Sequence, residues 1–140
     1  DVHKGSKPVR NPLRFALFAS FFPSQIAGPI KRYQDFDKQL EDPAKLKVTE
    51  SQLTEGLWLI ARGLFKKVAL GDNLAPIVQA GFANPQLMSS TDAWIAALAF
   101  AFQIYYDFSG YTDIGRGSAM LFGFSLPENF NMPYIARSLK

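Results

Sequence analysis

The chain has 140 residues, of which 48% are hydrophobic and 13 are phenylalanine, and its formal net charge is +3. This length is enough for one domain of ordinary size. The modest charge, with basic and acidic residues mixed over 31–50, argues against a nucleic-acid-binding surface. Because cysteine is absent, a disulfide framework and a thiolate metal site are excluded, and we expect no metal site.

Apolar and charged residues are segregated along the chain. Apolar stretches cover 13–30, 93–108 and 117–126, whereas charge is concentrated in 1–10 and 31–51. Soluble domains interleave the two kinds of residue, so this segregation favours a membrane protein. We expect an all-α fold: a polytopic membrane protein fragment with several transmembrane or re-entrant helices and amphipathic helices.

Residues 13–30, LRFALFASFFPSQIAGPI, form the first apolar segment. The segment is short for a full crossing, which takes roughly 20 residues. Pro23 should kink or end a helix, and Gly28-Pro29 should stop it. A broken or re-entrant membrane segment fits this pattern, and the alternative is a buried helix followed by a turn. The charged stretch 31–51 should be a loop with about one helical turn.

An amphipathic helix is predicted over 50–70. Thr49 and Gln52 have the spacing of a capping box, and leucine, isoleucine and valine then recur every three or four residues. The remaining face is basic and carries Arg62, Lys66 and Lys67. This stripe suits either the membrane interface or the wall of a polar cavity in a helix bundle.

Gly71-Asp72-Asn73 should end that helix, and Pro76 should allow a second, short one. Residues 91–106 are then the strongest transmembrane candidate, with Thr91 or Asp92 as the N-cap. Trp94 at one end and Tyr105-Tyr106 at the other form an interfacial belt. The alternative is a core helix of a soluble all-α protein.

A polar cluster follows this apolar segment directly. Ionisable groups at the edge of an apolar segment are costly unless they have a role. Asp113 and Arg116 are spaced to pair and neutralise each other, which is the structural alternative for both. Asp107 has no basic residue three or four positions away, and its structural alternative is a hydrogen bond from a neighbouring helix. Gly110 would let another backbone or a ligand approach closely.

Three stretches closely resemble, in the expected order, the membrane-bound O-acyltransferase family. They are FFPSQIAGPIKRYQDF (21–36), GLWLIARGLFKKVALGDNLAPIV (56–78) and QIYYDFSGYTDIGRGSAMLFGFSLPENFNMPYIARS (103–138). The likeness is to the branch of the alginate O-acetylation and teichoic acid D-alanyl transfer proteins, and it is nearer to the alginate members. On this resemblance, residues 1–140 are an internal part of a single acyltransferase domain.

The resemblance implies a multi-pass enzyme of the bacterial inner membrane that moves an acyl group, usually acetyl, to hydroxyls of an extracytoplasmic polysaccharide. The implied donor is a cytoplasmic acyl thioester such as acetyl-CoA, with no bound cofactor. The implied partners are the lipid bilayer and an extracytoplasmic acyltransferase partner protein. The family's catalytic histidine follows the Asn-Phe-Asn-x-Pro-Tyr stretch, so it is expected beyond Lys140. His3 is not its counterpart, and the fragment alone should be inactive.

The same resemblance implies seven residues that line the substrate channel or orient the substrate. They match the Asp-Phe-Ser-Gly-Tyr-x-Asp and Glu-Asn-Phe-Asn-x-Pro signatures of the family: Asp107, Ser109, Tyr111, Asp113, Glu128, Asn129 and Asn131. Loop capping is the structural alternative for the two asparagines. The alternative function is a non-enzymatic membrane scaffold, or a transporter fragment whose buried charges line a path. The acceptor polymer is left open.

Overall fold

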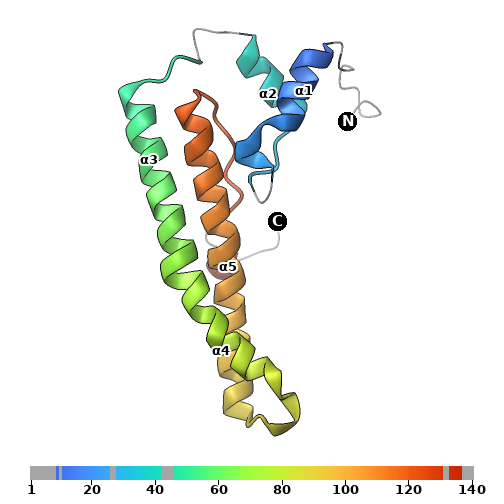
Figure 1. The fold of residues 1–140 in the computed structure, drawn as a ribbon, viewed down its shortest axis with the longest axis vertical. Coiled ribbons are helices and arrows are strands. Elements are labelled where there is room, and N and C mark those ends of the chain that lie inside the picture. The colour runs from blue at the N-terminus through green and yellow to red at the C-terminus, as the bar shows by residue number, and fades with distance from the viewer. Residues whose placement is uncertain (1–8, 10, 26–27, 42–45, 131–132, 137–140) are drawn as a thin grey trace.

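The computed structural model describes residues 9, 11–25, 28–41, 46–130 and 133–136. Every regular element in these ranges is helical, which confirms the all-α prediction. Figure 1 shows two long arms running side by side in opposite directions. The first arm joins α3 (Glu50–Leu64), the π-helix η4 (Phe65–Gly71) and α4 (Asp72–Ala83), and the second arm is α5 (Ser90–Leu121).

The two arms are joined by a short connection that contains η5 (Pro85–Leu87). Among the helices of the described residues, we find none whose length and hydrophobicity together suffice for crossing a bilayer. The transmembrane prediction for 91–106 is therefore not confirmed.

Both arms begin with a capping box. The Thr49 hydroxyl accepts a hydrogen bond from the Gln52 N–H, and the Gln52 side chain accepts one from the Thr49 N–H, as predicted. The predicted N-cap of α5 was wrong, because Ser89 is the cap. Asp92 takes the third helical position of that box, where its carboxylate accepts from the Ser89 N–H.

The first arm continues through Gly71-Asp72-Asn73, so the predicted stop was wrong. Gly71 contacts α5, and a Cβ there would lie only 2.6 Å from Oδ1 of Asp107. The glycine therefore serves close helix packing, which here outweighs its local tendency to end a helix. The Asn73 side chain donates to the carbonyls of Val68 and Ala69, within the wide turn of η4.

The arms approach each other closely at two pairs of glycines. A Cβ on Gly63 would lie 2.5 Å from the carbonyl oxygen of Gly110, and a Cβ on Gly117 would lie 2.4 Å from that of Gly56. This confirms that Gly110 admits a neighbouring backbone. Because these contacts fix how α3 lies against α5, they also fix which charged side chains meet across the interface.

A smaller lobe packs beside the C-terminal end of α5 (Figure 1). It contains α1 (Pro12–Ser20), η2 (Phe22–Ser24) and α2 (Tyr33–Leu40). Helix α1 ends before Pro23, as predicted. Helix α2 is longer than the single turn that we expected between 31 and 51.

Aromatic side chains hold this lobe against the segment that follows α5. Phe36 is 2% exposed and stacks on Phe124 with ring centroids 4.8 Å apart. Phe21 packs edge-on against both rings. Gly123 makes the turn into this segment with a φ of 78°. The Gly123 N–H donates to the carbonyl of Met120 and the Phe124 N–H donates to that of Ala119, and these two hydrogen bonds close the end of α5. The segment leads on towards η6 (Pro133–Ile135).

Candidate functional site

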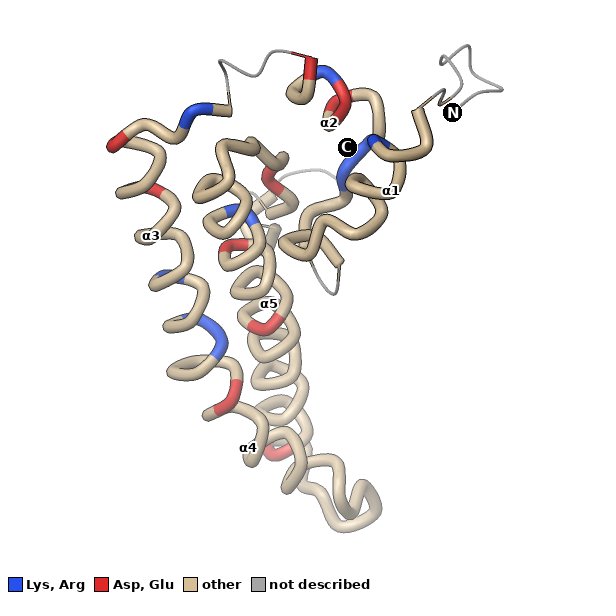
Figure 2. The backbone as a smooth tube through the Cα atoms, turned by 45° about the horizontal axis from the view of Figure 1, so that its top comes forward, with Lys and Arg blue, Asp and Glu red and all other residues tan. Residues whose placement is uncertain are grey.

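The basic stripe of the first arm faces α5, where it meets a buried carboxylate. Figure 2 shows basic residues in the middle of the first arm and acidic residues along α5. Arg62 donates to Asp113 through Nε at 3.0 Å and Nη2 at 2.7 Å, and Lys66 Nζ lies 2.7 Å from the same carboxylate. Arg62 and Lys66 line a cavity between helices, which is one of the two settings predicted for this stripe.

Asp113 is only 4% exposed, so its charge depends on these partners. Burial by itself disfavours the charged form of Asp113, but the hydrogen bonds from Arg62 and Lys66 favour it. Asp113 is therefore an ionised anchor for two cations. Since Arg62 and Lys66 occupy both of its oxygens, the carboxylate is poorly placed to accept a further proton.

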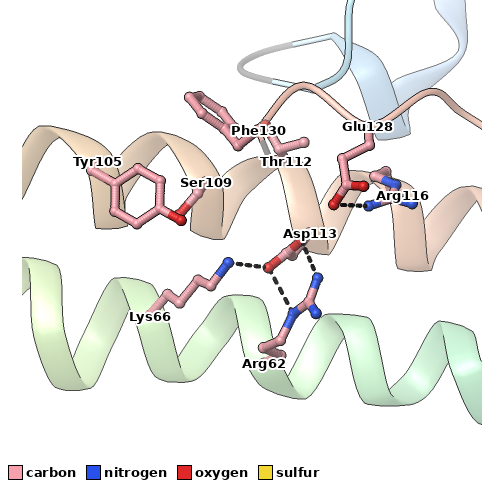
Figure 3. A pocket seen from close by; sticks show the side chains of 9 residues that line it. All are labelled: Arg62, Lys66, Tyr105, Ser109, Thr112, Asp113, Arg116, Glu128 and Phe130. Carbon is pink, nitrogen blue, oxygen red and sulfur yellow. Dashed lines mark hydrogen bonds and ion pairs between the residues drawn. The ribbon is translucent and has the colours of Figure 1, made fainter. Parts of the chain in front are cut away.

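The predicted pairing of Asp113 with Arg116 was wrong. The Arg116 guanidinium instead donates to Glu128 at 3.2 Å, in the segment after α5. Figure 3 shows the reason: Asp113 points towards α3, whereas Arg116 points towards the chain that returns beside α5. A spacing of three residues would allow Asp113 and Arg116 to pair on one helix face. Each side chain instead pairs with a residue on another segment.

Asp107 finds its partner across the interface as well. Lys67 Nζ lies 2.9 Å from Oδ1 of Asp107, and it also contacts Asp72. Oδ1 of Asp107 receives no well-aligned hydrogen bond from the described residues, so this contact is an ion pair. Lys66 and Lys67 are adjacent in sequence, yet both reach carboxylates of α5. Both lysines belong to the π-helix η4, and such wide turns occur often at functional sites.

A cavity of about 200 Å³ lies beside the Asp113 cluster. Figure 3 shows it between α3, α5 and the segment after α5. Nine side chains line it: Arg62, Lys66, Tyr105, Ser109, Thr112, Asp113, Arg116, Glu128 and Phe130. Three of these are cationic and two are anionic, so the lining carries a net positive charge.

Two hydroxyl groups of this lining are buried without a partner. Ser109 and Thr112 are each 2% exposed. Neither Ser109 Oγ nor Thr112 Oγ1 has a hydrogen-bond partner within the part of the chain that the structure describes. A buried polar group without a partner costs roughly 1–3 kcal/mol, so the two hydroxyls need an explanation.

The structure brings together some of the seven residues singled out from the sequence. Ser109, Asp113 and Glu128 line the cavity. Asp107 lies five residues before Thr112 in α5, in the ion pair with Lys67. The others are placed elsewhere: Tyr111 is 43% exposed, Asn129 is half-buried without lining the cavity, and Asn131 lies outside the described residues.

Several lining residues were missed from the sequence. Tyr105, Thr112 and Arg116 are three of them. With Ser109, which was singled out, they follow one another at helical spacing and share one face of α5. This polar row was the available signal. Phe130 was missed because only the fold of the segment after α5 brings its ring near Tyr105, with centroids 5.9 Å apart.

The lining offers mainly hydrogen-bond donors. Both oxygens of Asp113 already accept hydrogen bonds from the first arm. The hydroxyls of Ser109 and Thr112 and the remaining N–H groups of Arg116 are donors on the cavity side of α5. The described residues contain no group of three or more His, Cys, Asp or Glu side chains that could hold a metal ion.

Comparisons with known proteins agree with this sequence pattern. The model of the membrane-bound O-acyltransferase family matches residues 6–138. A probable alginate O-acetylase AlgI of Azotobacter vinelandii is 41% identical over 99% of the chain, which covers 27% of that protein. A peptidoglycan O-acetyltransferase of Helicobacter pylori is 40% identical over 91% of the chain and 24% of that protein.

A more distant relative has a different named activity. A teichoic acid D-alanyltransferase of Bacillus subtilis is 26% identical over 91% of the chain, which covers 32% of that protein. The chain thus spans about a quarter to a third of the length of these curated relatives.

Proposed function

Because the chain belongs to the membrane-bound O-acyltransferase family, we propose that the whole protein transfers an acetyl group from a cytoplasmic thioester donor, acetyl-CoA, to hydroxyls of an extracytoplasmic polysaccharide. One observation carries this proposal. Identity is 41% and 40% to relatives named for O-acetyl transfer, but 26% to one named for D-alanyl transfer. The first two relatives are named for different acceptors, alginate and peptidoglycan. We therefore propose a polysaccharide acceptor without naming the polymer.

Acyl transfer to a hydroxyl needs a base for the hydroxyl proton and donors for the oxyanion of the tetrahedral intermediate. Asp113 does not suit the role of base, since Arg62 and Lys66 donate to both of its oxygens and so lower its affinity for a proton. Among the described residues, the cavity lining contains no histidine, and His3 is not one of those residues. On the family resemblance, we propose that the base is a histidine outside the described residues.

The described residues then serve as a wall of the reaction site. Ser109 and Arg116 offer donors to the cavity, while Asp113 fixes the position of Arg62 and Lys66. Asp107 holds Lys67 against α5. Asn131 keeps its proposed orienting role on the family signature alone.

The surface of the two arms supports a membrane setting. Large apolar side chains are exposed on both arms, including Trp58 at 65% and Trp94 at 70%. A surface of this kind suits lipid or further helices of the same protein. We place the protein in the bacterial inner membrane as a multi-pass enzyme, with a partner protein outside the membrane that completes the transfer.

The experiment that tests this function measures ester-linked acetate on the cell's polysaccharides. The gene is deleted, and the exopolymer and the peptidoglycan are treated with mild base to release acetate. One of the two polymers should lose most of its acetate, and the full-length gene should restore it. Unchanged acetate in both polymers after the deletion would refute the proposal.

A further inference from the structure

The two buried hydroxyls beside the Asp113 cluster differ from two exposed hydroxyls in the described helices. Ser20 in α1 donates to the carbonyl of Ala16, and Thr54 in α3 donates to that of Glu50. This backbone bond is the usual way in which a helix satisfies such a side chain. Ser109 and Thr112 do not make it, although both are buried and Ser20 and Thr54 are exposed.

The Arg116 guanidinium lies on the same face of α5 and has further N–H groups that can donate hydrogen bonds. It has five N–H donors, and within the described residues it donates to Glu128 alone. Its side chain is 21% exposed, so it is largely withdrawn from water. Ser109, Thr112 and Arg116 thus present donors to one cavity, at helical spacing.

The charge of the lining indicates what these donors would bind. Three cations face two carboxylates, and Asp113 already receives hydrogen bonds from Arg62 and Lys66. The cavity therefore has more donors than acceptors and an excess of positive charge. An anionic group that only accepts hydrogen bonds fits this environment better than a neutral hydroxyl.

We propose that Ser109, Thr112 and Arg116 form a binding subsite for an anionic oxygen group, a phosphate or a carboxylate, of one of the substrates. The cavity of about 200 Å³ has room for one such group. The phosphate would come from a coenzyme-A thioester, and the carboxylate from a uronate unit of the polymer. Tyr105 and Phe130 line the aromatic side of the cavity, with ring centroids 5.9 Å apart (Figure 3).

This inference deepens the proposed function, on which it rests for the source of the anion. The test measures binding without acyl transfer, so the two proposals can fail separately. Full-length protein in detergent is titrated with inorganic phosphate or with glucuronate, at constant ionic strength set with chloride. The shift of the melting temperature with concentration gives an apparent Kd.

The wild-type protein should be stabilised by at least one of the two anions. Stabilisation by phosphate alone would assign the subsite to the donor, and stabilisation by glucuronate alone would assign it to a uronate polymer. Stabilisation by both would mean that the subsite accepts either group. Stabilisation by neither would overturn the proposal.

Variants of the two hydroxyls test the subsite itself. Ser109→Ala and Thr112→Val should each raise the apparent Kd about tenfold, because each removes one hydrogen bond to a charged group. Thr112→Ser, which keeps the hydroxyl, should bind as the wild type does. The matched controls Ser20→Ala and Thr54→Val remove hydroxyls that bond to the backbone, and they should leave the Kd unchanged. A wild-type Kd in both Ser109→Ala and Thr112→Val would overturn the assignment.

Discussion

Arg62 and Asp113 form a two-point ion pair that joins the two arms of the fold, with donor–acceptor distances of 3.0 and 2.7 Å. The paired geometry matches the fork of a guanidinium to the two oxygens of a carboxylate. Lys66 adds a third contact at 2.7 Å. The cluster therefore determines where the cationic wall of the cavity lies relative to α5.

Asp113→Asn should lower the free energy of unfolding by about 2 kcal/mol, because it leaves two cations with a neutral partner. The loss is smaller than for a fully buried pair, since the Arg62 side chain is 38% exposed. Thermal melting of the full-length protein in detergent measures this loss of stability. The control is Asp35→Asn, whose exposed pair with Lys38 at 3.8 Å should matter little. Equal effects of the two substitutions would contradict the anchoring role of Asp113.

Gly63→Ala should destabilise the hairpin of the two arms. The new Cβ would lie 2.5 Å from the Gly110 carbonyl oxygen, which is backbone and cannot rotate away. Overpacking costs about 1–3 kcal/mol, whereas the better helix propensity of alanine returns up to about 1 kcal/mol. A net loss of about 1 kcal/mol is expected from melting curves.

Thr54→Ala, at an exposed position of the same helix, is the control for Gly63→Ala. It should leave the melting temperature nearly unchanged. If Gly63→Ala were as stable as Thr54→Ala, the close approach of the backbones at Gly63 and Gly110 would not be needed.

Gly123→Ala should weaken the junction between α5 and the smaller lobe. A φ of 78° costs an alanine about 1–2 kcal/mol, and its Cβ would lie 2.3 Å from the carbonyl oxygen of Leu46. The expected result is a lower melting temperature together with faster hydrogen exchange at the Phe124 amide, which closes the end of α5. Unchanged exchange at that amide would argue against this junction.

Asp107→Ala should reduce polymer acetylation about tenfold at a normal protein level, the effect of losing one charged contact. The reason is that Lys67 loses its partner on α5. Asp72→Ala is a matched control, because it removes the other partner of Lys67 but lies on the first arm and is half exposed. Ester-linked acetate per unit of protein is the readout. Equal losses in both variants would show that the position of Asp107 on α5 has no special importance.

Local features were predictable from the sequence, whereas contacts between distant segments were not. The capping box of Thr49 and Gln52 was predicted because both residues lie within one turn. The partners of Asp113 were missed because Arg62 and Lys66 are about fifty residues away, and only the packing of the arms brings them together. The end of the first arm was misplaced for a related reason, since Gly71 packs against Asp107.

The candidate site could be predicted in part. Ser109, Asp113 and Glu128 were singled out by resemblance, and they do share a cavity. Thr112 and Arg116 also line the cavity, and the family signatures did not single them out. A search for polar residues at helical spacing along 105–116 would have found both, because a helix brings such residues to one face.

The most direct test of the central claim follows a labelled acetyl group. Membranes that contain the full-length protein and its partner are incubated with deuterated acetyl-CoA and the cell's polysaccharide, and mass spectrometry measures ester-linked acetyl on the polymer. We expect deuterated acetyl esters that depend on the protein and that mild base removes. Intact, folded protein that leaves the polymer without deuterated esters would contradict the central claim.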